Sequence, residues 1–111
     1  PLDAAVDCYG AFVVGEVPPE LPLDARPIVG MTPSLSCPLL GLFGAEDAHP
    51  SPDETPVLQK ALADSGKVFE LHTYEGAGHA FFSVDRPSYR PEAANDGWRR
   101  IEGWFRRYLA A

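Results

Sequence analysis

The sequence predicts an α/β fold with about three parallel strands and flanking helices, on three observations. Residues 38–44 form a continuously apolar run, as is typical of a parallel strand covered on both faces. Residues 68–74 form a second strand pattern, and a helix-length segment at 51–66 separates the two. A long amphipathic pattern from about 92 to 109 predicts a closing helix. Strands joined by helices run parallel with right-handed crossovers, so this order of elements predicts α/β architecture.

The amino-terminal part predicts one strand and one long loop. Residues 4–9 form a short apolar run that Gly10 stops, which predicts a buried strand. The segment 15–36 contains five prolines. Proline lacks a backbone N–H and disfavours helix in the residue before it, so this segment is expected to be a connecting loop. Loops of this length are uncommon in compact domains and often serve a function or cover a site.

The first helix has start and stop signals of its own. Ser51 is expected to cap it, Pro52 to occupy its first position, and Glu54 to complete a capping box. Gly66 is expected to end it. The residues predicted to form its apolar stripe are Val57, Leu58, Ala61 and Leu62.

The closing helix presents one apolar face at steps of four, three, four and three residues. That face is predicted to comprise Ala94, Trp98, Ile101, Phe105 and Tyr108, widened by Trp104. The two tryptophans and Tyr108 are interpreted as core packing.

Composition bounds the class of protein. The 111 residues fit one domain, 1–111, and 45% of them are hydrophobic. A net charge of −7 argues against nucleic acid or an anionic membrane as a partner. We see no signal peptide and no apolar run of the ~20 residues that span a bilayer. Cys8 and Cys37 form no C-x-x-C pair and are expected to be reduced thiols, which favours a cytoplasmic location.

Two reactive side chains follow the ends of neighbouring predicted strands. Asp47 comes after the strand at 38–44, and His79 follows the strand at 68–74 through a glycine-rich turn. Catalytic groups collect beyond the carboxyl ends of parallel strands, so we expect the carboxylate and the imidazole to meet above one edge of the sheet. A carboxylate that accepts the Nδ1–H of histidine prepares Nε2 for proton transfer.

Structural interpretations remain open at this point. Asp47 could cap a turn, and His79 could be an ordinary loop residue. Glu46, Asp47 and His49 lack the regular spacing of metal ligands, so no metal is expected. Arg86 suits either a substrate carboxylate or a structural ion pair. No phosphate-binding glycine loop is present, and no cofactor is expected.

The amino-acid sequences of these loops resemble those of the dienelactone hydrolase family of the α/β-hydrolase superfamily. The matching segments are 42–47 with Pro50, which resemble the family's acid loop; 75–82, which resemble its histidine loop; 86–89, 93–94 and Trp98 after it; and 3–6 with 9–10 near the start of the chain. The resemblance extends over nearly the whole chain apart from the proline-rich loop.

This resemblance implies hydrolysis of a small ester or lactone by a Cys or Ser nucleophile, with Asp47 as the acid and His79 as the base. It also makes Phe81 and Arg86 candidates for substrate binding. The chain contains no G-x-C-x-G or G-x-S-x-G elbow, so the family's chain order places the nucleophile upstream of Pro1. The chain is therefore expected to be the carboxyl-terminal part of an α/β-hydrolase domain and inactive alone.

One departure and one alternative complete these expectations. Dienelactone-cleaving members carry an arginine shortly after the histidine, where this chain has Ser83, which argues against dienelactone itself as the substrate. The alternative is a non-catalytic interaction module, because a truncated sheet exposes an apolar edge or face. Its partner would be a second copy of the chain, as a homodimer, or the missing amino-terminal half.

Overall fold

The computed structural model describes residues 1–109 and confirms the α/β class. The strands are parallel, as predicted, and lie in the order β1-β2-β3 in one sheet. The elements, in chain order, are β1 (Ala5–Cys8), the 3₁₀ helix η1 (Val29–Ser34), β2 (Leu39–Gly44), α1 (Thr55–Asp64), β3 (Phe69–Tyr74) and α2 (Pro91–Leu109).

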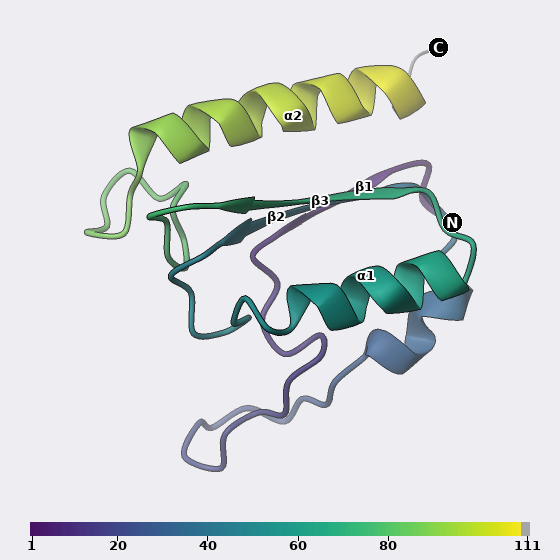
Figure 1. The fold of residues 1–111 in the computed structure, drawn as a ribbon, viewed down its shortest axis with the longest axis horizontal. Coiled ribbons are helices and arrows are strands. Elements are labelled where there is room, and N and C mark those ends of the chain that lie inside the picture. Colours follow the sequence, from purple (N-terminus) through teal and green to yellow (C-terminus); the bar gives the residue numbers. More distant parts are fainter. Residues whose placement is uncertain (110–111) are drawn as a thin grey trace.

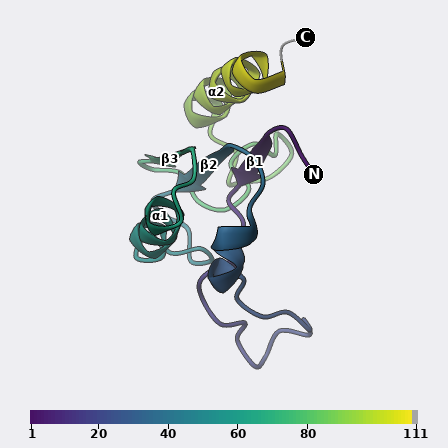
Figure 2. The same cartoon turned by 90° about the vertical axis from the view of Figure 1, so that its right-hand side faces the viewer.

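The molecule has three layers, with the sheet between α2 on one face and α1 with η1 on the other (Figures 1 and 2). Because the strands are parallel, their carboxyl ends lie at one edge of the sheet. There the loops after β2 and β3 run side by side (Figure 1). No helix within residues 1–109 is long and apolar enough to cross a membrane.

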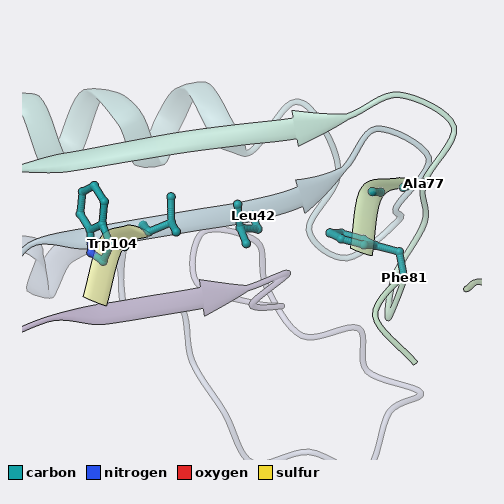
Figure 3. Close-up of a cluster of buried hydrophobic side chains, with 6 residues drawn as sticks. Leu42, Ala77, Phe81 and Trp104 are labelled. Carbon is teal, nitrogen blue, oxygen red and sulfur yellow. The ribbon is translucent and has the colours of Figure 1, made fainter. Parts of the chain in front are cut away.

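Two buried clusters hold the layers together. On the α2 face, Leu40 and Leu42 of β2 pack with Phe81 and Trp104. Figure 3 shows that Phe81 lies at the carboxyl end of the strands and Trp104 toward their beginnings. On the α1 face, Phe43 packs against Leu58 and Leu62, together with residues that are partly buried. Successive side chains of β2 point to opposite faces, so this strand contributes to both clusters.

The first strand differs from the prediction. All four residues of β1 are half-buried, whereas the sequence predicted a buried strand. The reason is its place in the sheet: β1 pairs with β2 on one side, and no strand of residues 1–109 pairs with its other side. Central β2 is buried from Leu40 to Gly44, as its apolar sequence predicted.

The helix α1 begins later than predicted, at Thr55. Residues Ser51 to Glu54 form a turn in which the Glu54 carboxylate accepts the Ser51 N–H at 2.6 Å. The same carboxylate also accepts the Gly15 N–H at 2.9 Å, so Glu54 anchors a distant loop. Pro56, and not Pro52, occupies the first turn of the helix. Val57, predicted to be part of the apolar stripe, is exposed.

The buried face of α2 is rotated only slightly from the predicted one. Ala94 and Trp104 are buried, and Ile101 and Tyr108 pack against the same cluster, as predicted. Ala93 and Gly97 are buried as well, while Trp98 is 59% exposed and is not a core residue. Gly97 explains the rotation, because the Phe82 ring occupies the space that a Cβ of residue 97 would need. The Trp98 ring instead contacts the edge of Phe82, at 5.3 Å between centroids. A search for large apolar residues does not reveal Gly97, which is buried because its lack of a side chain leaves room for Phe82.

The proline-rich segment is a loop interrupted by η1, which packs against α1. Ile28, Met31 and Leu35 line an apolar groove of about 540 Å³ beside β1. The part of this segment from Ile28 to Leu35 therefore borders the groove. None of residues 15–36 lines the cavity beside His79 described below.

Candidate active site

Asp47 is held in a tight loop at the end of β2. Its own N–H donates to the carbonyl of Gly44, and the N–H of Glu46 donates to the carbonyl of Ala77. The side chain is only 2% exposed. One carboxylate oxygen, Oδ1, accepts the backbone N–H of His49 at 2.8 Å, which fixes the direction of the other oxygen.

His79 reaches Asp47 because the loops after β2 and β3 approach each other closely. A Cβ on Gly44 would clash with the carbonyl groups of Ala77 and Gly78, so only glycine permits this approach. Gly76 turns the chain with φ +73°, a backbone conformation that favours glycine. Ala80, directly after the histidine, also has a left-handed φ of +65°.

The expected meeting of carboxylate and imidazole is confirmed. The Nδ1 atom of His79 lies 2.8 Å from Oδ2 of Asp47. An ionised carboxylate only accepts hydrogen bonds, so it favours the tautomer that carries a proton on Nδ1. The imidazole is 48% exposed, in contrast to the carboxylate, so Nε2 is left to exchange a proton with a bound molecule. In this geometry a carboxylate can orient an imidazole for proton transfer.

A cavity of about 460 Å³ adjoins the pair. Its walls come from the loop after β1 and from the Asp47 loop, and its lining residues are Ala11, Phe12, Glu46, Asp47, Ala48, His49 and His79. The rings of Phe12 and His49 contact each other, with centroids 5.2 Å apart. The cavity therefore combines an apolar wall with the Asp47 carboxylate and the His79 imidazole.

Tyr9 supports the imidazole from the end of β1. Its ring lies edge-on to His79, at 4.9 Å between centroids, and its N–H donates to the carbonyl of Leu42 at 2.7 Å. Burial raises the pKa of the Tyr9 phenol, and the neighbouring Ser83 hydroxyl and Arg86 charge partly oppose that rise. Through Tyr9, the carboxyl end of β1 also contributes to the site, beside those of β2 and β3.

The sequence-based reasoning missed Tyr9, Ala11 and Phe12 as site residues. The Tyr9-Gly10 pair carried part of the family resemblance, which was the one available signal. Phe12 has a left-handed φ of +62°, which is rare for an aromatic residue and which no sequence pattern announced.

The two predicted substrate-binding residues do not lie in the cavity. Phe81 is fully buried in the cluster on the α2 face, so its side chain serves the core and is not available to a substrate in this fold. Arg86 is exposed and does not line the cavity. It forms no ion pair with any residue from 1 to 109, which removes the structural alternative in this part of the chain.

Neither cysteine has the surroundings of a nucleophile. Burial and the adjacent Asp7 carboxylate raise the pKa of the Cys8 thiol. Since the thiolate is the reactive form, both effects make Cys8 less reactive. Cys37 is buried at the opposite end of the sheet, just before β2 begins. Within the described residues there is also no group of three or more potential metal ligands.

Relatives of known sequence share this chain's pattern. The model of the dienelactone hydrolase family matches residues 1–109. A candidate carboxymethylenebutenolidase from Methylorubrum extorquens is 37% identical over 99% of this chain and 36% of its own length. Another from Saccharolobus solfataricus is 35% identical over 90% of this chain and 42% of its own length. The chain thus spans well under half the length of these relatives.

Solved structures give the same result. The crystal structure of a candidate dienelactone hydrolase from Klebsiella pneumoniae superposes with a TM-score of 0.81 and 35% identity, over 96% of this chain and 42% of that one. Esterase 2 from Thermogutta terrifontis, at 20% identity and a TM-score of 0.69 over 95% of this chain and 40% of that one, shares the fold. The fold is accordingly of the α/β-hydrolase type, and the chain belongs to the dienelactone hydrolase family.

Proposed function

We propose that this chain supplies the acid and the base of a Cys- or Ser-His-Asp triad that hydrolyses esters or lactones. The observation that carries the proposal is the 2.8 Å contact between His79 Nδ1 and Asp47 Oδ2 at the carboxyl edge of the sheet. Membership of a hydrolase family supports it. The buried carboxylate and the half-exposed imidazole match the different tasks of an orienting acid and a base.

Each residue has a defined part in the reaction. His79 Nε2 takes the proton from the nucleophile as it attacks the ester carbonyl, and then returns a proton to the leaving alcohol. Asp47 keeps the ring in the Nδ1–H tautomer and stabilises the imidazolium while it exists. The nucleophile belongs to a part of the domain outside these 111 residues, because Cys8 lies within β1 and burial raises its pKa.

The first test is hydrolysis of 4-nitrophenyl acetate by the chain alone. We expect no rate above that of the His79→Ala variant, since an acid and a base without a nucleophile activate water only weakly. A clear rate that depends on His79 would contradict the assignment of the nucleophile to another segment.

The second test uses a chimera in which this chain replaces the segment that it matches in the Methylorubrum extorquens relative. The chimera is expected to hydrolyse the ester, and His79→Ala and Asp47→Asn are each expected to abolish most of the rate. Asp53→Asn, an exposed substitution in the following turn, serves as the matched control. A folded, active chimera that is indifferent to His79→Ala would refute the proposed triad.

A contribution of Arg86 to substrate binding stays a prediction. Its guanidinium lies near Tyr9 and outside the cavity lining, so it would act on a substrate group that extends beyond the cavity. Arg86→Gln in the chimera is expected to raise KM for an ester that carries a distant anionic group and to leave KM for a neutral ester unchanged.

The interaction module is kept as a second candidate because of the surface beside β1. The groove there is lined mainly by apolar residues, and the outer edge of β1 is unpaired within residues 1–109. Ile28 and Met31, which border it, are exposed. If the chain associates as a homodimer through this surface, sedimentation velocity will show a dimer that Met31→Glu dissociates. A monomer at all concentrations would count against this candidate.

A further inference from the structure

We infer that the cavity beside His79 accepts the neutral, apolar end of an ester and disfavours a carboxylate. This inference rests on the proposed function for the reaction, but it concerns only which chemical groups the cavity holds. Two independent features support it: a fixed aromatic wall and an uncompensated acidic side chain.

The wall is built by the chain that leaves β1. Phe12 has a left-handed backbone conformation, and its ring contacts the His49 ring with the two centroids 5.2 Å apart. The carbonyl of the next residue, Val13, accepts the N–H groups of Ile28 and Val29, both at 2.9 Å, which anchors this loop to the segment before η1. An aromatic ring held in this way offers a flat apolar surface to a bound group.

The ionisable groups that line the cavity are two carboxylates and two imidazoles. Asp47 uses both carboxylate oxygens, one for His49 N–H and one for the His79 ring. Glu46 is exposed, lines the cavity, and its carboxylate forms no ion pair with residues 1–109. No lysine or arginine of the described residues lines the cavity. The Glu46 backbone is fixed by its hydrogen bond to Ala77, so the side chain starts from a defined place.

A carboxylate bound in this cavity would meet the unpaired charge of Glu46 at short range. Two like charges about 6 Å apart, in surroundings with an effective dielectric constant of about 40, repel enough to weaken binding about tenfold. An uncharged group of the same shape avoids this penalty and keeps the contact with Phe12. The cavity therefore discriminates by charge as well as by shape.

The test compares two esters of one shape on the 111-residue chain by NMR titration. Methyl benzoate is the neutral probe, and monomethyl terephthalate is its carboxylate-bearing analogue. We expect methyl benzoate to shift the signals of Phe12, Ala48 and His79, and the carboxylate analogue to bind about tenfold more weakly. Glu46→Gln should remove most of that difference. Glu75→Gln, which removes an equal charge from an exposed residue that does not line the cavity, should not.

Phe12→Leu should weaken binding of methyl benzoate while His79 still contacts Asp47, as its ring signals report. Equal or tighter binding of the carboxylate analogue to the unmodified chain overturns the inference. Weaker binding of that analogue to Arg86→Gln also overturns it, because Arg86 would then serve the cavity. Failure of methyl benzoate to bind overturns it as well. These binding measurements need no nucleophile. An inactive chimera therefore overturns only the proposed triad. An active chimera that shows no preference for the neutral ester over the carboxylate-bearing one overturns only this inference.

Discussion

Replacing Asp47 by asparagine tests the geometry of the site most directly. The substitution keeps the shape of the side chain but replaces one carboxylate oxygen by an NH₂ group. The Asn oxygen can still accept the N–H of His49, as Oδ1 does now at 2.8 Å. The NH₂ group then faces Nδ1 of His79, which also carries a proton, so two donors stand opposite each other. His79 has to move its proton to Nε2, and Nδ1 becomes the acceptor.

The energetic cost follows from burial. A hydrogen bond to a charged group contributes about 1.5–3 kcal/mol to stability. Here the imidazole is 48% exposed, so water replaces part of what it loses, and the bond to His49 survives. We therefore expect Asp47→Asn to lower the free energy of unfolding by about 1 kcal/mol. In the active chimera the effect on kcat should be far larger, about 10⁴-fold as in a serine-protease triad with the same exchange, because the wrong nitrogen carries the proton.

The assay is ¹⁵N–¹H correlation of the imidazole nitrogens, with urea unfolding in parallel. The spectrum of the unmodified chain should show His79 in the Nδ1–H form when neutral, and that of Asp47→Asn should show the Nε2–H form. Asp53→Asn, which is exposed, should change neither the tautomer nor the stability. If His79 already carries its proton on Nε2, or if Asp47→Asn leaves the tautomer unchanged, the reasoning about this pair is wrong.

Three further predictions concern the packing and the titrating groups around the site. Phe81→Ala should lower the free energy of unfolding by about 3–5 kcal/mol, measured in urea, because the ring is fully buried in the core beside the histidine loop. Tyr74 should give a late phase near pH 12 in an absorbance titration, since burial and its bond to Asp96 raise its pKa to about 12, and Tyr74→Phe should remove that phase. Its folded-state pKa lies above the ordinary value of 10, so Tyr74 loses its stabilising effect as pH rises from about 10 to 12, and Tyr74→Phe should be less sensitive in that range. The side chain of Asp7→Asn can still accept the hydrogen bond from Gly10 N–H. Burial raises the pKa of Asp7, so the unmodified chain loses stability as this carboxyl ionises. The stability of the variant relative to the unmodified chain should therefore increase as pH rises above about 4. If the difference in stability between Asp7→Asn and the unmodified chain is the same at acidic and neutral pH, the pKa of Asp7 is not raised and the reasoning is wrong.

The fold could be predicted from the sequence where hydrophobicity alone decides. The strand β2 is apolar at every position and is buried from Leu40 onward, so its place at the centre of the sheet followed from composition. The predictions were less accurate where a neighbour decides. The burial of β1 depends on which strands flank it, and the rotated face of α2 depends on Phe82 filling the space over Gly97. Neither neighbour is close in the sequence.

The same division applies to the site. The sequence by itself indicated that Asp47 and His79 meet, because parallel strands bring their carboxyl ends to one edge, and each of these residues follows such an end. Only the tertiary structure placed Tyr9 and Phe12 around them and withdrew Phe81 into the core. The physical reason is the distance along the chain between the residues that interact. Local sequence patterns indicate the strands and their order, whereas the lining of a cavity depends on backbone angles and on contacts between loops that are distant along the chain.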